Sequence, residues 1–283
     1  MATEGLTEVA TAASIASGDV LRTMTTLRDR REPFAVATVI ETQGSVSAKT
    51  GSKAVVGRDG RVVAGWVGGG CAAGTVCQAA LDSIESGETT IVDLDLDDEV
   101  LGTGMPCGGT MRVFVEPFRP KPRLWVLGHG KVAETLCAIG ATIGFEVVID
   151  DPMADRAHYP QATQLLAEDF DYSRLDPQAE DCVVVATQHK GDHQSMARCL
   201  RAPVPYIALI ASRKRSKLVI DYLRDEGFGE ADLARVYAPA GLDLGARTPE
   251  EIALSVLSEI VMLRHKASGV QRRQAKPGNV RGG

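Results

Sequence analysis

The alternation of apolar and polar residues predicts an α/β protein. In residues 5–30 apolar side chains recur at helical spacing, and Pro33 ends the predicted helix. Asp59-Gly60 has the composition of a hairpin turn between two strands. Residues 72–85 have helical spacing and are followed by Gly87, a common helix terminator. The strands predicted in this half of the chain are residues 34–40, 53–57, 61–67, 89–96 and 110–116.

The second half of the chain alternates short apolar runs with helical patterns, which is typical of a parallel sheet covered by helices. Thr248-Pro249-Glu-Glu251 combines an N-cap residue, a proline and an acid at the start of the last helix. The predicted strands are residues 124–127, 146–149, 164–166, 181–186 and 205–210. We therefore expect a Rossmann-like doubly wound parallel sheet in the C-terminal half, joined to an N-terminal α/β domain.

A proline-rich linker, Pro117 to Pro122, separates the two halves. It predicts an N-terminal domain over residues 1–117 and a nucleotide-binding domain over 121–266. Residues 267–283 are basic and poor in apolar side chains, so we expect a disordered tail.

Composition narrows the class of protein. The 283 residues carry a net charge of −6, which does not favour a nucleic-acid surface. We find no apolar run of the roughly 18 residues that a membrane helix needs. The N-terminus lacks the features of a signal peptide, so we expect a cytoplasmic protein. The 6 cysteines are then expected to be thiols rather than disulfides.

Gly128-His-Gly130-Lys-Val-Ala133 follows an apolar strand and opens a predicted helix. Gly128 permits a sharp turn, and Gly130 permits close approach of a pyrophosphate to the backbone. Asp150 ends the next strand at the position of an acid that binds a ribose. We expect His129, inside this turn, to contact a ligand through its backbone.

Two further segments are candidates for ligand binding, the first of them at the carboxyl edge of the sheet. Thr187 to Asp192 follows a buried strand, and ligands bind at the carboxyl ends of such strands. Ser212 is the predicted N-cap of a basic helix that begins with Arg213 to Lys217. These cations either hold a phosphorylated ligand or are simply exposed.

Two cysteines lie beside paired glycines. Cys71 follows Gly69-Gly70 and precedes a helix, whose dipole lowers a thiol pKa, while Cys107 precedes Gly108-Gly109. Either cysteine is a reactive ligand for a soft metal or a small residue that fills a core gap. The other four, Cys77, Cys137, Cys182 and Cys199, are expected in the core.

Several of these segments together resemble the XdhC/CoxF family of maturation factors for molybdenum hydroxylases. The resemblance covers most of the chain. The motifs that carry it are Thr42-Gln-Gly-Ser45, Asp59-Gly60, Gly68-Gly-Gly-Cys71, Cys107-Gly-Gly109, Gly128-His-Gly130, Asp150-Asp151, Ala186 to Asp192, Ala211-Ser-Arg-Lys214, Pro239 to Gly245 and Thr248 to Ser255.

The resemblance implies a protein that binds the molybdenum cofactor, as molybdopterin or its dinucleotide form. It would protect the cofactor during sulfuration by a cysteine desulfurase. It would then deliver it to an apo molybdenum hydroxylase subunit of the xanthine, aldehyde or carbon monoxide dehydrogenase type. Family members are often homodimers and are not known to turn over a substrate of their own. Cys71 and Cys107 would be the metal ligands, in one cleft with the Gly128 turn.

The chain departs from the family pattern at two positions. Val46-Ser-Ala-Lys49 stands where family members often have Ser-Pro-Arg, and Ala73 stands where they often have an acid. Roles of that arginine and that acid therefore do not carry over to this chain.

Two alternatives remain open from the residues. The G-x-G-x-x-A turn also fits an NAD(P)-dependent oxidoreductase, although the sequence offers no clear proton-donating pair. A protein-binding scaffold with a vestigial nucleotide fold is the other alternative.

Overall fold

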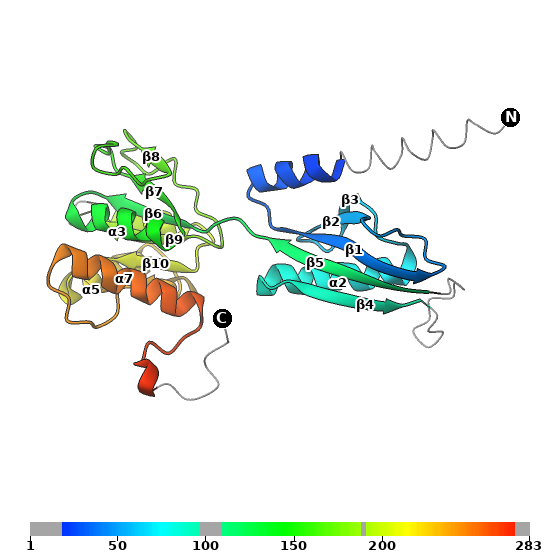
Figure 1. Ribbon diagram of the computed structural model, residues 1–283. Helices are drawn as coiled ribbons and strands as arrows, with labels where there is room; N and C mark the ends of the chain where they lie inside the picture. The colour runs from blue at the N-terminus through cyan, green and yellow to red at the C-terminus, as the bar shows by residue number, and fades with distance from the viewer. Residues whose placement is uncertain (1–18, 97–108, 188–190, 275–283) are drawn as a thin grey trace. The chain divides into compact units, whose positions relative to one another are not determined.

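A computed structural model describes residues 19–96, 109–187 and 191–274. The chain divides into two compact units, Met1–Pro120 and Lys121–Gly283, which we call unit 1 and unit 2 (Figure 1). The division falls inside the proline-rich linker, whose first residues, Pro117 and Phe118, still belong to a strand of unit 1.

Unit 1 contains an antiparallel sheet of five strands in the order β3-β2-β1-β5-β4. Residues 19–29 are helical and precede the first strand. The other elements are β1 (Phe34–Gly44), β2 (Lys53–Gly57), β3 (Val62–Gly65), α2 (Gly70–Ser86), β4 (Thr90–Asp95) and β5 (Gly109–Phe118).

Period-2 alternation decides which face of this sheet is covered. Ala37 and Val39 of β1 are fully buried and pack with α2 through Val76 and Ala80. On the other face, Val36 packs against the helix over residues 19–29. Gly87 ends α2 in the left-handed conformation, as predicted.

β1 is longer than the sequence predicts. The composition of residues 41–44 predicts the beginning of a loop, but they continue the strand because Glu41 to Gly44 pair with Arg112 to Gly109 of β5. The register shifts between Val39 and Glu41, and the extra residue at this bulge keeps the strand paired while changing its twist.

Unit 2 contains a six-stranded sheet in the order β11-β10-β9-β6-β7-β8, and every pairing is parallel. This is the doubly wound arrangement that the sequence predicts. Its elements are β6 (Arg123–Gly128), α3 (Lys131–Thr142), β7 (Glu146–Asp150), β8 (Gln164–Leu166), β9 (Cys182–Ala186), α4 (Asp192–Leu200), β10 (Tyr206–Leu209), α5 (Arg213–Asp225), α6 (Glu230–Leu233), β11 (Val236–Tyr237), α7 (Pro249–Arg264) and η2 (Arg272–Gln274).

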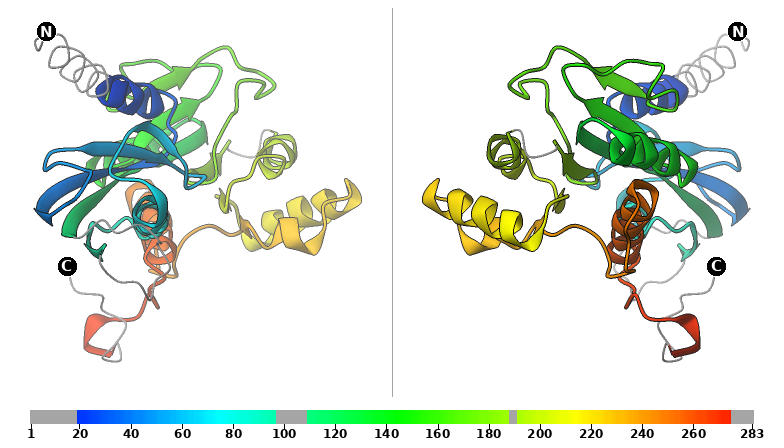
Figure 2. Two further views of the ribbon diagram at one scale, coloured as in Figure 1. Left: turned by 90° about the vertical axis from the view of Figure 1, so that its right-hand side faces the viewer. Right: turned by 90° about the vertical axis from the view of Figure 1, so that its left-hand side faces the viewer.

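The two faces of this sheet carry separate cores. Leu124, Val126 and Ile149 face α3 and α7, whereas Leu127 and Val148 face α4 and α5. Figures 1 and 2 show α3 and α7 together on one side of the strands, with α5 on the other. The carboxyl ends of β6, β9 and β10 meet at one edge, so the segments that follow them are brought together.

The capping box predicted for the last helix is confirmed. Thr248 accepts a hydrogen bond from the Glu251 N–H, and the Glu251 carboxylate accepts one from the Thr248 N–H. In the tail, Arg272–Gln274 forms a single 3-10 turn, and residues 275–283 lie outside the described part. Among the described residues, no helix is long and apolar enough to span a membrane.

Candidate functional site

The turn between β6 and α3 is fixed by contacts on three sides. Gly128 has φ +111°, and a Cβ there would lie 2.5 Å from the Ala186 carbonyl oxygen, so the position requires glycine. Gly130 is the N-cap of α3 with φ 90°, and its backbone hydrogen-bonds to the Tyr159 hydroxyl. The glycine pattern in the sequence therefore reflects real backbone requirements.

His129 lies between these glycines, and its side chain has a partner that the sequence does not indicate. Its Nδ1 atom is 2.8 Å from Oδ2 of Asp151, the residue after β7. Oδ1 of Asp151 accepts a hydrogen bond from the Met153 N–H at 2.8 Å. The Asp151 carboxylate is thus bound to the turn itself.

A cleft of about 1010 Å³ opens at this edge of the sheet. His129 and Lys131 line it at the start of α3, and Ser212 and Arg213 line it at the start of α5. The remaining lining residues are Val132, Ala186, Ile210, Ala211, Pro239 to Ala246, Pro249, Ile252 and Ser255.

The cleft favours an anion. The backbone N–H groups at the first turns of α3 and α5 carry partial positive charge. Arg213 adds a full charge, whereas Lys131 is paired with Glu134 at 3.4 Å. Arg213 forms no ion pair with any residue that the structure describes. Asp243 is the acid in the lining, so cations outnumber acids there.

The loop Pro239 to Ala246 forms one wall of the cleft and is held by α7. The Ser255 hydroxyl donates to the Leu242 carbonyl at 2.6 Å. Glu259 accepts from the Gly241 N–H at 3.0 Å and from the Tyr206 hydroxyl at 2.7 Å. These bonds give the wall a defined position before any ligand binds.

Thr187 lies at this edge but does not line the cleft. It is buried, and its hydroxyl donates to Asp192, whose other oxygen accepts from Arg215 Nε at 3.1 Å. This network ties the start of α4 to α5. Residues 188–190, between Thr187 and Gly191, lie outside the described part.

Asp150 is not presented to the cleft. Alternation along β7 places it on the same face as Val148, which packs toward α4 and α5. Its side chain is fully buried, and neither oxygen has a hydrogen-bond partner among the residues that the structure describes. Burial, and then the charge of Asp169, raise the pKa of Asp150 to about 7. The acid that reaches the turn is its neighbour Asp151.

The cysteine motifs belong to unit 1. Gly69 is the N-cap of α2 and Gly70 has φ +58°, and no described atom lies within 4 Å of a Cβ built at either position. Cys71 follows at the start of the helix, but its side chain is outside the described part, as is the whole of Cys107. The predicted metal site at Cys71 and Cys107 therefore stays a prediction. Within the described ranges, no cluster of three or more His, Cys, Asp or Glu side chains is arranged to hold a metal.

The other cysteines suit packing rather than chemistry. Cys137, Cys182 and Cys199 are buried, and Cys77 is half-buried. Burial raises the pKa of Cys137 to about 11 and that of Cys182 to about 12. Little thiolate is available at either position near neutral pH.

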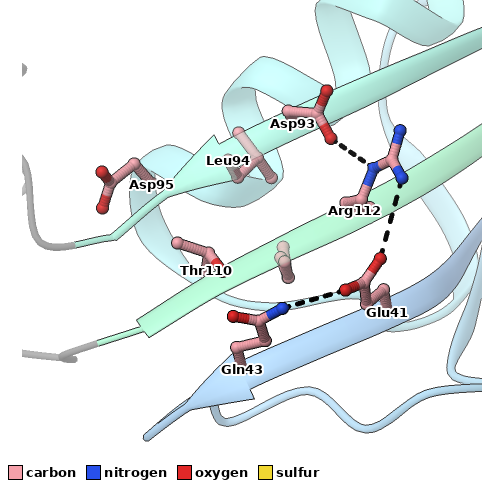
Figure 3. A pocket seen from close by; sticks show the side chains of 8 residues that line it. Glu41, Gln43, Asp93, Leu94, Asp95, Thr110 and Arg112 are labelled. Carbon is pink, nitrogen blue, oxygen red and sulfur yellow. Dashed lines mark hydrogen bonds and ion pairs between the residues drawn. The ribbon is translucent and has the colours of Figure 1, made fainter.

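Unit 1 has a smaller hollow, of about 260 Å³, on its open sheet face (Figure 3). Arg112 Nε lies 2.6 Å from Asp93, and Arg112 Nη1 lies 3.7 Å from Glu41. Gln43 donates to Glu41 at 3.0 Å. Figure 3 shows these side chains, from β1, β5 and β4, pointing toward one another, so the cation in the described lining is already paired with acids.

These features define a two-unit α/β protein whose Rossmann unit carries a cationic cleft at the topological switch point. Comparison with known families is more specific. The model of the XdhC Rossmann domain matches residues 124–260, and that of the XdhC and CoxI family matches residues 27–95. Together the matches span well over half of the chain. The chain belongs to the XdhC family, which confirms the resemblance found in the sequence.

Three curated relatives are similar to the chain. YqeB of Escherichia coli K12, an uncharacterized protein, is 30% identical over 250 residues, covering 86% of this chain and 46% of YqeB. A Bacillus subtilis 168 protein, named as a probable subunit of xanthine dehydrogenase, is 31% identical over 167 residues, 57% of this chain and 48% of that protein. The E. coli K12 molybdenum cofactor insertion chaperone PaoD is 24% identical over 264 residues, 81% of this chain and 83% of PaoD.

The chain thus spans about half the length of YqeB and of the Bacillus protein. A solved structure described as a xanthine dehydrogenase from Bacillus halodurans is 21% identical, with a TM-score of 0.47 over 91% of this chain and 98% of the other. That likeness is too distant to support an argument about function.

Proposed function

We propose that this protein binds the molybdenum cofactor and delivers it to an apo molybdenum hydroxylase subunit. The observation that carries the proposal is a cationic cleft, at the phosphate-binding turn of unit 2, in a chain of the XdhC family. The names of the Bacillus relative and of PaoD point in the same direction.

The lining of the cleft fits the phosphate end of such a cofactor. Lys131, Arg213 and the first turns of α3 and α5 supply donors to a phosphate, and the Pro239 to Ala246 loop supplies a wall for an organic group. No sulfur-containing side chain is found in the described lining, so the cleft by itself offers the metal no soft ligand. When bound, the cofactor would bring a metal–dithiolene centre that this chain carries rather than uses.

Cys71 is the residue that we propose for the metal end. It stands at the start of α2, where the helix dipole favours a thiolate, and the exposed glycines before it leave room for a ligand. We extend the same proposal to Cys107. We further propose that a cysteine desulfurase sulfurates the bound cofactor. We also propose that the protein is a homodimer and is located in the cytoplasm.

The test is chemical analysis of the small molecule that accompanies the protein. Protein purified from a host that makes the cofactor should release a phosphorylated pterin detectable by mass spectrometry. Material that carries no pterin, and takes up none when molybdopterin is offered, would overturn the proposal.

The role of Cys71 is tested separately. Cys71→Ala should lower the fraction of pterin retained through gel filtration, whereas Cys77→Ala, on the same helix, should not. Equal retention by both variants would remove Cys71 from the site.

One observation favours the alternative function of an NAD(P)-dependent oxidoreductase. His129 and Asp151 form a pair of the kind that oxidoreductases use to move protons. The position of Asp150 weighs against it, since the predicted ribose acceptor faces away from the cleft. Calorimetric titration with NAD and NADP decides this alternative, which requires heat from at least one of them.

A further inference from the structure

The side chain of His129 has two properties that bear on ligand binding at this turn. It lines the cleft, with about half of its surface exposed (52%), and it is bound to an acid whose side chain is only 7% exposed. The sequence predicts only a backbone role for this residue, because any residue fits between the two glycines of the motif.

The acid raises a problem for an anionic ligand. Asp151 lies directly after β7, next to the turn that receives the phosphate, and little water reaches its carboxylate to screen the charge. An anion at this turn would be repelled by it. His129 is the residue that both contacts this carboxylate and faces the cleft.

We propose that His129 binds the phosphate group of the ligand through its side chain, held in place by Asp151, and offsets the charge of Asp151 toward that ligand. The inference rests on the proposed function for the identity of the ligand. The cations Lys131 and Arg213 line the same cleft, so His129 completes a set of positively charged and hydrogen-bonding groups from two elements.

His158 provides a matched control. Its Nδ1 atom lies 2.9 Å from Asp155 Oδ2, its side chain is exposed, and it belongs to the same unit, but it does not line the cleft. A general effect of losing one histidine–carboxylate pair should therefore appear in His158→Ala as well.

The test measures the affinity of the full chain for inorganic pyrophosphate by isothermal titration calorimetry. His129→Ala should weaken binding about 10- to 100-fold, the usual effect of losing a hydrogen bond to a charged group. Asp151→Asn should bind as tightly as the unmodified chain or more tightly, because its single amide oxygen can still accept from the imidazole, at the expense of the Met153 N–H bond, and the repelling charge is gone. His158→Ala should bind within about 2-fold of the unmodified chain, since an exposed pair outside the cleft contributes little.

The double variant His129→Ala/Asp151→Asn separates a ligand contact from a structural role. It should regain part of the affinity that His129→Ala loses, because no buried carboxylate remains to repel the anion. A merely structural histidine predicts no such recovery. Thermal melting of each variant confirms that the compared proteins are folded.

Three results would overturn the inference. These are unchanged affinity in His129→Ala, a double variant as weak as His129→Ala alone, and an equal loss in His158→Ala. A protein that carries no pterin but binds pyrophosphate through His129 would refute the proposed function and leave this inference standing. A protein that carries pterin, and whose His129→Ala variant binds pyrophosphate as tightly as the unmodified chain, would support the proposed function and overturn this inference.

Discussion

The hollows of the two units differ in how their charges are balanced. In unit 1, Arg112 is bonded to Asp93 and Glu41, so the charged row on the open sheet face satisfies itself. In unit 2, Arg213 lines a larger cleft and has no ion-pair partner among the described residues. A paired surface needs no ligand, whereas an unpaired cation beside helix N-termini gains from binding an anion. On this difference we base the proposal that unit 2, rather than unit 1, binds the anion.

The largest expected effect comes from the backbone that shapes this cleft. Gly128→Ala places a Cβ 2.5 Å from the Ala186 carbonyl oxygen at a φ of +111°. We expect a loss of more than about 3 kcal/mol in the free energy of unfolding, because both clash and backbone strain oppose the variant. Urea denaturation measures the loss.

Gly144→Ala is the matched control for this variant. Gly144 has φ +95°, and none of the described residues comes within 4 Å of its Cβ position. It should cost only about 1–2 kcal/mol, the strain of the left-handed conformation alone. Equal losses in the two variants would show that the approach to Ala186 does not constrain the turn.

The second comparison concerns buried acids within unit 2. Asp150 is buried and has no hydrogen-bond partner in the described part of the chain, and its pKa is raised from 3.8 to about 7. The folded state binds the proton of the Asp150 carboxyl group more tightly than the unfolded state does. The stability that this proton contributes is therefore present below pH 4 and is lost as the pH rises through 7. A pKa difference of this size corresponds to at most roughly 4 kcal/mol.

Asp150→Asn should therefore be more stable than the unmodified chain at pH 8 and similar to it at pH 4. Asp181 is the control, since it is also buried but accepts hydrogen bonds from Arg123 N, Gln178 N and Trp125 Nε1 at 2.8–3.2 Å. Asp181→Asn should destabilise the protein at pH 8, because it disrupts a satisfied network. Urea denaturation at pH 8 measures the change in the free energy of unfolding for each variant. If both changes have the same sign, the lack of described partners does not explain the behaviour of Asp150.

The two adjacent acids also show where inference from the sequence ends. The spacing of the motif correctly locates the end of β7, but not which acid faces the turn. That choice depends on the phase of the strand, which packing against α4 and α5 decides. Asp151, Ser255 and Glu259 gain their roles through contacts between segments far apart in sequence, and such contacts leave no local pattern.

Most of the fold is predictable, since β6, β7 and β9 are apolar runs and α7 carries a complete capping box. The errors in the predicted strands occur where hydrogen bonding to a neighbouring strand, rather than local composition, decides the structure. β11 has only two residues, Val236–Tyr237, and exists because β10 pairs with it. The polar end of β1 is a strand because β5 continues alongside it.

The third expected effect is on ligand binding. Arg213→Ala should weaken the affinity of the cleft for pyrophosphate about 10-fold, because an exposed cation gives a partly screened contact. Lys217→Ala, one turn further along α5 and outside the cleft, should leave the affinity unchanged. Calorimetry at low salt measures both. An equal loss in the two variants would mean that the net charge of the helix, rather than the position of Arg213, attracts the anion.

The smallest effect is expected in unit 1. Arg112→Ala breaks contacts to Asp93 and Glu41, but all three side chains are about half exposed or more, so water and salt already weaken these pairs. We expect a nearly unchanged melting temperature and unchanged affinity for pyrophosphate, in contrast to Arg213→Ala. Because the variant removes a cation from a paired row, it also leaves Asp93 and Glu41 uncompensated, which makes this face more acidic. A clear loss of pyrophosphate affinity in Arg112→Ala would place an anion site on unit 1. The contrast between the paired Arg112 of unit 1 and Arg213 in the cleft of unit 2 would then not explain where the anion binds.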